Sequence, residues 1–170
     1  MGKKKIKKLE KNEIKTYLKM VTSKFITEGF TVENLKVNNY DFIVATKKQF
    51  KWRSHPNQLN IFVVVGATDK ITREVIEEYS KRSMDFALEQ NEGLPTETQS
   101  GVVSFALLSS FDIDTEAKQW IQNRPDKRFV PFEMPIISDL KNNEVYYYEK
   151  NPIWGAIYHE FFKDFIKKHF

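Results

Sequence analysis

The residues from 47 to 55 combine side-chain types that could bind a single-stranded nucleic acid. Cations alternate with aromatic rings there, and the candidate binding residues are Lys48, Lys51, Trp52 and Arg53. Proteins bind single strands by stacking the bases on rings while neighbouring cations neutralise the phosphates. An exposed hairpin that tucks one or two rings against a sheet has the same composition, so both interpretations stay open.

Other kinds of chemical site lack the residues that they need. The chain has no cysteine, which excludes disulfides, thiolate metal sites and cysteine nucleophiles. His55, His159 and His169 do not have the spacing of metal ligands. No glycine-rich phosphate loop and no Gly-x-Ser-x-Gly nucleophile turn occurs. We therefore expect no cofactor, no metal and no catalytic residue.

A polar segment over residues 94–101 is the second place of interest. Long polar loops at the mouth of a sheet often carry function. A plain connector between two elements explains the same composition, so the sequence leaves the role of this segment open.

A strand, a turn and a helix form the expected centre of the fold. Residues 60–65 are the most continuous β-branched and aromatic run in the chain, which is typical of a strand covered on both faces. The helix that follows carries one apolar stripe, which includes Ile76 and Met84. A second buried strand is predicted over residues 102–109.

The remaining elements complete an α/β or α+β sandwich in one domain. Periodicity predicts further helices over residues 12–28, 114–121 and 152–167, and further strands over 31–37, 40–46, 129–138 and 144–149. Because Pro131 and Pro135 cannot donate to a ladder, the strand that holds them is expected at a sheet edge or broken in two. Asn142 and Asn143 predict a hairpin turn. We expect a mixed sheet of about five to six strands, flanked by three to four helices.

The order of these elements resembles that of restriction-endonuclease-like folds. The resemblance implies a metal held by an acid on one strand and by an acid-x-lysine triplet on the next. Asp41 matches the first acid, but the following strand, residues 61–65, has no carboxylate and no lysine. The resemblance therefore implies this fold without its nuclease site, and it leaves open whether Asp41, Glu133 and Asp139 converge.

The chain also resembles a family of small prokaryotic proteins of uncharacterised function. Four segments carry the resemblance: residues 94–101 (LPTETQSG), 132–135 (FEMP), 144–149 (EVYYYE) and 154–155 (WG). It covers about the last two thirds of the chain. This family has no activity to transfer, so the resemblance adds no catalytic residue.

The net charge of +4 resides in the N-terminal segment. Residues 1–11 hold six lysines against Glu10, a net charge of +5, which leaves −1 for the other 159 residues. We expect 1–11 to be a flexible lysine-rich arm and 12–170 to be a single globular domain. Such an arm can attract nucleic acid or an anionic membrane. No apolar run is long enough to span a membrane, and a chain without cysteine suits the cytoplasm.

The last helix carries a wider apolar stripe than one contact with a sheet needs. Its large apolar residues form two adjacent columns, namely Ile153, Ile157, Phe161 and Phe165, and Trp154, Tyr158, Phe162 and Ile166. Because other helices compete for the same sheet, we expect part of the second column (Trp154, Tyr158 and Phe162) to bind a second copy or another protein.

Three classes of function are compatible with these patterns. We favour a non-enzymatic cytoplasmic domain that binds a protein partner. The first alternative is a nucleic-acid-associated protein that uses the lysine-rich arm and residues 47–53. The second alternative is an enzyme, such as a diverged nuclease, whose site the sequence does not reveal.

Overall fold

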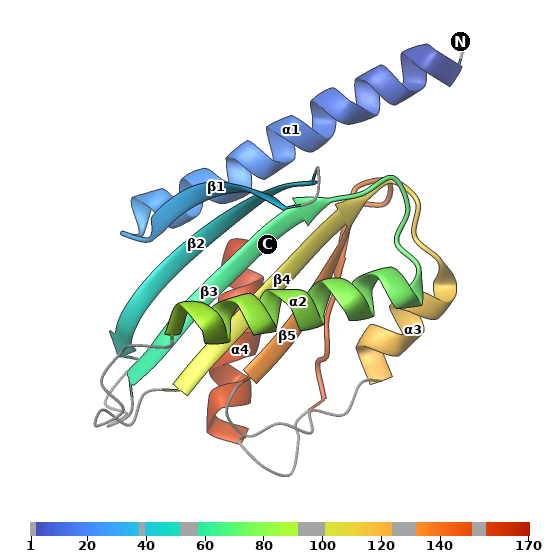
Figure 1. The fold of residues 1–170 in the computed structure, drawn as a ribbon. Coiled ribbons are helices and arrows are strands. Elements are labelled where there is room, and N and C mark those ends of the chain that lie inside the picture. Colours follow the sequence, from blue (N-terminus) through green and yellow to red (C-terminus); the bar gives the residue numbers. More distant parts are fainter. Residues whose placement is uncertain (1–2, 38–39, 52–57, 92–100, 124–131, 151–155) are drawn as a thin grey trace.

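The computed structural model describes residues 3–37, 40–51, 58–91, 101–123, 132–150 and 156–170 (Figure 1). These residues form a mixed six-stranded sheet between two layers of helices. The strands lie across the sheet in sequence order: β1 (Thr31–Val37), β2 (Tyr40–Lys51), β3 (Gln58–Ala67), β4 (Gly101–Ser110), β5 (Phe132–Asp139) and β6 (Glu144–Tyr146). The predicted α/β sandwich with a mixed sheet is thus confirmed.

Strand direction divides the sheet into two parts. β1, β2 and β3 form an antiparallel meander. β3, β4 and β5 run parallel, because α2 (Arg73–Asn91) and α3 (Thr115–Asn123) provide the crossovers between them. β6 returns antiparallel to β5 after a turn in which Asn143 has a φ of 55°. Asparagine tolerates this left-handed conformation, and the predicted hairpin turn is confirmed.

Each face of the sheet has its own apolar core. α1 (Lys3–Thr27) and α4 (Ala156–His169) cover one face, where Phe25 and Phe105 are fully buried. α2 and α3 cover the opposite face, where Met84 is fully buried. β3 and β4 are buried along almost their whole length, as their unbroken apolar runs predict.

The path of β5 differs from the prediction. The strand is unbroken through Pro135 and lies between β4 and β6. Proline fits there because β6 pairs only with residues 137–139, so that among the described residues one side of β5 has no strand partner at Pro135. The prediction of a broken strand or an edge strand was therefore wrong, because β5 is continuous and pairs with a strand on each side.

The start of α1 also differs from the prediction. The helix begins at Lys3, within the lysine-rich arm, and not at Asn12. Lysine is a good helix former, and a helix fixed by burial of Val21 and Phe25 extends easily toward its N-terminus. The N-terminal half of α1 consequently reaches past the sheet (Figure 1).

α1 has 25 residues, which is enough to cross a bilayer. Its lysines make it too polar for that environment. None of the helices in the described ranges is both long and apolar enough to span a membrane.

The ends of α1 and α4 are joined by a cluster of polar groups and rings. Lys168 Nζ and His169 Nε2 each lie 2.9 Å from the Glu28 carboxylate. The other ring nitrogen of His169 lies 2.7 Å from the Phe165 carbonyl, and its ring stacks on Phe25 at 4.8 Å between centroids. His169 is 2% exposed, so this histidine has a packing role.

We expect the Glu28 contacts to stabilise the fold above about pH 4.5 and to be lost in acid. Burial alone would raise the pKa of Glu28, but hydrogen bonds from Lys168 and His169 outweigh it and lower the pKa. A lowered pKa in the folded state gives stability that disappears as the pH falls through that pKa. Chemical unfolding of wild type and Glu28→Gln from pH 6 to pH 3 should show the two stabilities converging. A constant difference across this range would contradict the prediction.

Candidate functional site

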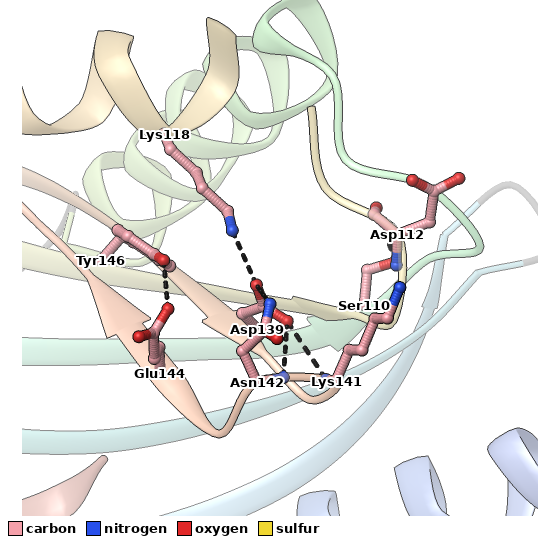
Figure 2. A network of polar contacts seen from close by, with 8 residues as sticks. All are labelled: Ser110, Asp112, Lys118, Asp139, Lys141, Asn142, Glu144 and Tyr146. Carbon is pink, nitrogen blue, oxygen red and sulfur yellow. Dashed lines mark hydrogen bonds and ion pairs between the residues drawn. The ribbon is translucent and has the colours of Figure 1, made fainter. Parts of the chain in front are cut away.

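A network of polar side chains lies where β4 and β5 end (Figure 2). Its centre is the carboxylate of Asp139, a residue that is 3% exposed. Lys118 Nζ, from α3, donates to Asp139 Oδ2 over 2.8 Å, and Asn142 Nδ2 donates to the same oxygen over 2.9 Å. The backbone N–H groups of Lys141 and Asn142 each donate to Oδ1 over 3.1 Å.

These four donors make Asp139 a structural link. Burial alone would raise the pKa of Asp139, but hydrogen bonds from Lys118 and Asn142 outweigh it and lower the pKa. The bond to Asp139 is the main reason that the pKa of Lys118 is raised. A carboxylate has about four acceptor positions, and here each has a donor. The network therefore joins α3 and the last hairpin to the sheet, and it uses the acceptor positions of Asp139.

The loops after β3 and β4 are tied together in the same way. Ser110 Oγ accepts a hydrogen bond from the backbone N–H of Asp112 over 3.0 Å and lies 3.0 Å from the Asp69 carbonyl oxygen. Lys70 and Asp114 form an ion pair of 2.8 Å across these loops. Ligands often bind beyond the carboxyl ends of parallel strands, but here Ser110, Lys70 and Asp114 bind groups of the protein itself.

The three acids that could have formed a nuclease-like site lie apart. Asp41 is exposed near the start of β2, 3.9 Å from Lys36. Glu133, near the start of β5, accepts a hydrogen bond of 2.8 Å from Ser80. Asp139 ends the same strand, roughly 20 Å further on at 3.3 Å per residue. Within the described ranges, no three His, Cys, Asp or Glu residues are close enough to hold a metal.

The structure describes only part of the basic segment that follows the middle of β2. Lys48 is exposed, Lys51 ends β2, and Trp52 and Arg53 lie outside the described residues. Lys47 has a structural role, because its Nζ donates a hydrogen bond of 2.7 Å to the Glu28 carbonyl oxygen and lies over the Phe30 ring.

Lys47 thus lies at the C-terminal end of α1, whereas the lysine-rich arm forms the opposite end of the same helix (Figure 1). Lys47 and the lysine-rich arm therefore do not lie on one surface. The polar loop over residues 94–100 lies outside the described residues, and Gly101 begins β4.

The column of α4 that was expected to bind a partner is partly internal. Phe162 is 1% exposed, and its ring meets the rings of Phe105 and Phe132 edge-on at 5.7 and 5.0 Å. Tyr158 is half-buried beside Phe132, and Trp154 lies outside the described residues. Phe162 finds cover because α2 and α3 occupy the opposite face, which leaves room for α4 beside α1. It is a core residue, and it offers no surface to a partner.

A groove opens between α2 and the hairpin of β1 and β2. Its volume is about 380 Å³, and its apolar lining comes from Leu35, Phe42, Val44, Val64, Tyr79 and Phe86. α2 lies over β3, β4 and β5. α2 meets the same face of β2 at one place, where the Phe42 and Tyr79 rings lie 5.8 Å apart between centroids. Beyond this contact no described helix lies over that face of β1 and β2 (Figure 1).

Tyr79 forms a fixed wall of this groove. Its hydroxyl lies within hydrogen-bond distance of two backbone carbonyl oxygens, those of Val64 at 3.2 Å and Leu107 at 3.1 Å, and can donate to either of them. Burial raises the pKa of Tyr79, so the phenol stays protonated as a donor. Gly66 permits the close approach, because a Cβ there would lie 2.9 Å from Tyr79 Oη and 3.2 Å from Phe42 Cδ1.

The rim of the groove is acidic. Asp85 and Glu89 of α2 border the groove. The side chain of Glu33 in β1 lies on the same face of the sheet as its cross-strand partner Val44. All three carboxylates are exposed, and none forms an ion pair within the described part of the chain. Arg82 is the cation at this rim, and it pairs with Glu78. The groove therefore suits a ligand that carries both apolar and cationic groups.

The sequence patterns did not reveal this groove, because its lining comes from four elements. One signal was present. Leu35, Phe42 and Val44 are apolar residues of one face of an edge hairpin, and no neighbouring segment was predicted to cover that face.

Comparisons with known proteins gave no match. No protein-family model, no curated protein and no solved structure is significantly similar to this chain. Function is therefore inferred from the residues of the chain itself.

Proposed function

We propose that this protein is a non-enzymatic cytoplasmic domain that binds a protein partner in the groove between α2 and the β1–β2 hairpin. The main support is the apolar lining of that groove, in which Leu35, Phe42 and Phe86 stay partly exposed beside α2. Open apolar surface of this kind usually marks an interaction site. The separation of Asp41, Glu133 and Asp139 weighs against the enzymatic alternative. It is also compatible with a restriction-endonuclease-like fold that lacks the nuclease site.

The partner is expected to present apolar anchors flanked by lysine or arginine. The anchors would lie among Leu35, Phe42 and Phe86, and burial of one large apolar side chain is worth about 1.5–3 kcal/mol. The flanking cations would meet Glu33, Asp85 and Glu89 at the rim. Charge complementarity of this kind increases the association rate and the specificity.

The outer edge of β1 adjoins the same surface. β1 is the first strand of the sheet, so its outer edge has no strand partner among the described residues. An extended partner segment could add to this edge through backbone hydrogen bonds while its alternate side chains enter the groove. This geometry favours a peptide segment over a compact small molecule.

Two designed peptides test the proposal by calorimetric titration. The first is an amphipathic peptide of leucine and lysine, and the second has glutamate in place of each lysine. Wild type should bind the lysine peptide more tightly. The double variant Leu35→Ser/Phe86→Ser should bind it at least about tenfold more weakly, which corresponds to a loss of about 1.4 kcal/mol.

Met20→Ser is the matched control, because Met20 is an exposed apolar residue of α1, 49% accessible, outside the groove. This variant should bind the lysine peptide as wild type does. Equal affinity for the two peptides, or an unchanged affinity in the double variant, would count against the groove as the binding site.

A further inference from the structure

Five lysines of α1 form one ridge along the helix. With 3.6 residues per turn, Lys4, Lys8, Lys11, Lys15 and Lys19 fall within a sector of about 80°. All five side chains are exposed. At 1.5 Å per residue the ridge is about 22 Å long. We call these five residues the lysine ridge.

Intramolecular ion pairs do not neutralise the lysine ridge. None of its members forms an ion pair within the described ranges. Glu10 and Glu13 lie roughly 140–160° around the helix from the centre of the ridge. Asp41 is an exposed carboxylate on the sheet face that α1 covers, and it forms an ion pair with Lys36. The ridge therefore presents its full positive charge to solvent.

This arrangement disfavours the helix itself. Lys4 and Lys8, Lys11 and Lys15, and Lys15 and Lys19 are like-charge pairs at a spacing of four residues. Each such pair destabilises a helix, because the two like charges lie one turn apart on the same face. A polyanion bound along the ridge would relieve all three repulsions at once.

The ridge is also accessible to a large partner. The N-terminal half of α1 extends past the sheet (Figure 1), and Val21 is the first buried residue among the side chains of the helix that the structure describes. The groove beside α2 lies on the opposite face of the sheet from α1. A partner on the ridge and a partner in the groove can therefore bind independently.

We propose that the lysine ridge binds the phosphate backbone of a nucleic acid duplex without sequence preference. Lysine side chains that neutralise phosphates release condensed counterions, and this release supplies the affinity of nonspecific binding. No aromatic side chain lies within the sector of the ridge, so the ridge cannot stack the unpaired bases of a single strand.

An anionic membrane fits the ridge less well than a duplex. A helix that lies on a membrane needs an apolar face beside its cations. Leu18, Val21 and Phe25 pack against the core, and Leu9 lies roughly 120° around the helix from the ridge. The helix cannot direct the ridge and a continuous apolar face toward one surface.

Salt-dependent binding of a short mixed-sequence DNA duplex tests the proposal, with fluorescence anisotropy as the measurement. Each neutralised phosphate contributes about −0.9 to the slope of log K against log salt. Five lysines therefore predict a slope of about −4 to −4.5 for wild type. The triple variant Lys8→Gln/Lys11→Gln/Lys15→Gln should reduce its magnitude by about 2.7 and weaken binding on the order of 10²-fold at about 0.1 M salt.

The matched control is Lys81→Gln/Lys141→Gln/Lys167→Gln, which removes the same charge from three exposed lysines elsewhere. It should keep a slope near that of wild type, and circular dichroism should show that both variants stay folded. An equal loss of slope in both variants would overturn the proposal. So would a lack of duplex binding by wild type, or tighter binding to single-stranded DNA or to phosphatidylserine vesicles than to the duplex.

Discussion

Replacing Asp139 by alanine is expected to lower the free energy of unfolding by about 3–5 kcal/mol. The change removes the acceptor of all four hydrogen bonds at the end of β5. It leaves the Lys118 ammonium without its carboxylate and two backbone N–H groups without their acceptor, and unpaired buried polar groups are costly. A domain of this size has a total stability of about 5–15 kcal/mol, so the loss would be a large fraction of it.

Urea unfolding followed by circular dichroism measures this loss. Asp139→Asn keeps an acceptor for the backbone N–H groups, so we expect a smaller loss of about 1–2 kcal/mol. Asp164→Ala is the control, because Asp164 is an exposed carboxylate of α4, and its removal should change stability by less than about 0.5 kcal/mol. A loss below about 1 kcal/mol for Asp139→Ala would show that the network does not hold α3 and the hairpin in place.

The pH dependence of the same variants gives an independent check. The pKa of Asp139 is lowered in the folded protein. Its contribution is therefore fully present above the pKa of an unfolded aspartate, about 3.9, and disappears as the pH falls through the folded-state pKa. The stabilities of wild type and Asp139→Asn should converge in strong acid.

The central elements could be predicted because their local signals agree with their tertiary environment. The unbroken apolar runs of β3 and β4 become strands buried on both faces, since parallel strands lie beneath crossover helices. The pair Asn142–Asn143 becomes a turn because asparagine tolerates a positive φ. In these cases one short segment carries all the information that its structure needs.

The errors arose where the structure depends on a partner that is distant in sequence. Pro135 was expected to break or expose its strand, but the short length of β6 provides a local edge for it. Phe162 was expected at a surface, because the periodicity of a helix does not say which face of the sheet its neighbours occupy. α2 and α3 lie on the other face, so α4 has room to bury this residue.

The candidate site was the least predictable feature for the same reason. Asp41, Glu133 and Asp139 are suitable metal ligands by type, but the register of β5 puts two of them at opposite ends of one strand. The groove is lined by residues of β1, β2, β3 and α2. No single segment contains its pattern, and only the pairing of β1 with β2 brings Leu35 beside Phe42.

Replacing Phe105 by alanine is expected to cost about 3–5 kcal/mol, the usual range for a buried phenylalanine. Phe105 is 0% exposed in the middle of β4. Its ring stacks on Phe165 at 4.3 Å and meets Phe162 edge-on at 5.7 Å. Truncation would leave a cavity between the sheet and α4, and the loss of two ring contacts adds to the loss of buried area.

Phe86→Ala is the matched control, because Phe86 is a half-buried ring of the groove on the other face of the sheet. We expect it to cost about 1 kcal/mol, the typical effect of one substitution. The midpoint of urea unfolding should fall far more for Phe105→Ala, at an unchanged slope. Peptide binding should show the reverse order, since folded Phe105→Ala keeps an intact groove and Phe86→Ala does not. If Phe86→Ala were as destabilising as Phe105→Ala, the groove ring would belong to the core and would not be a binding surface.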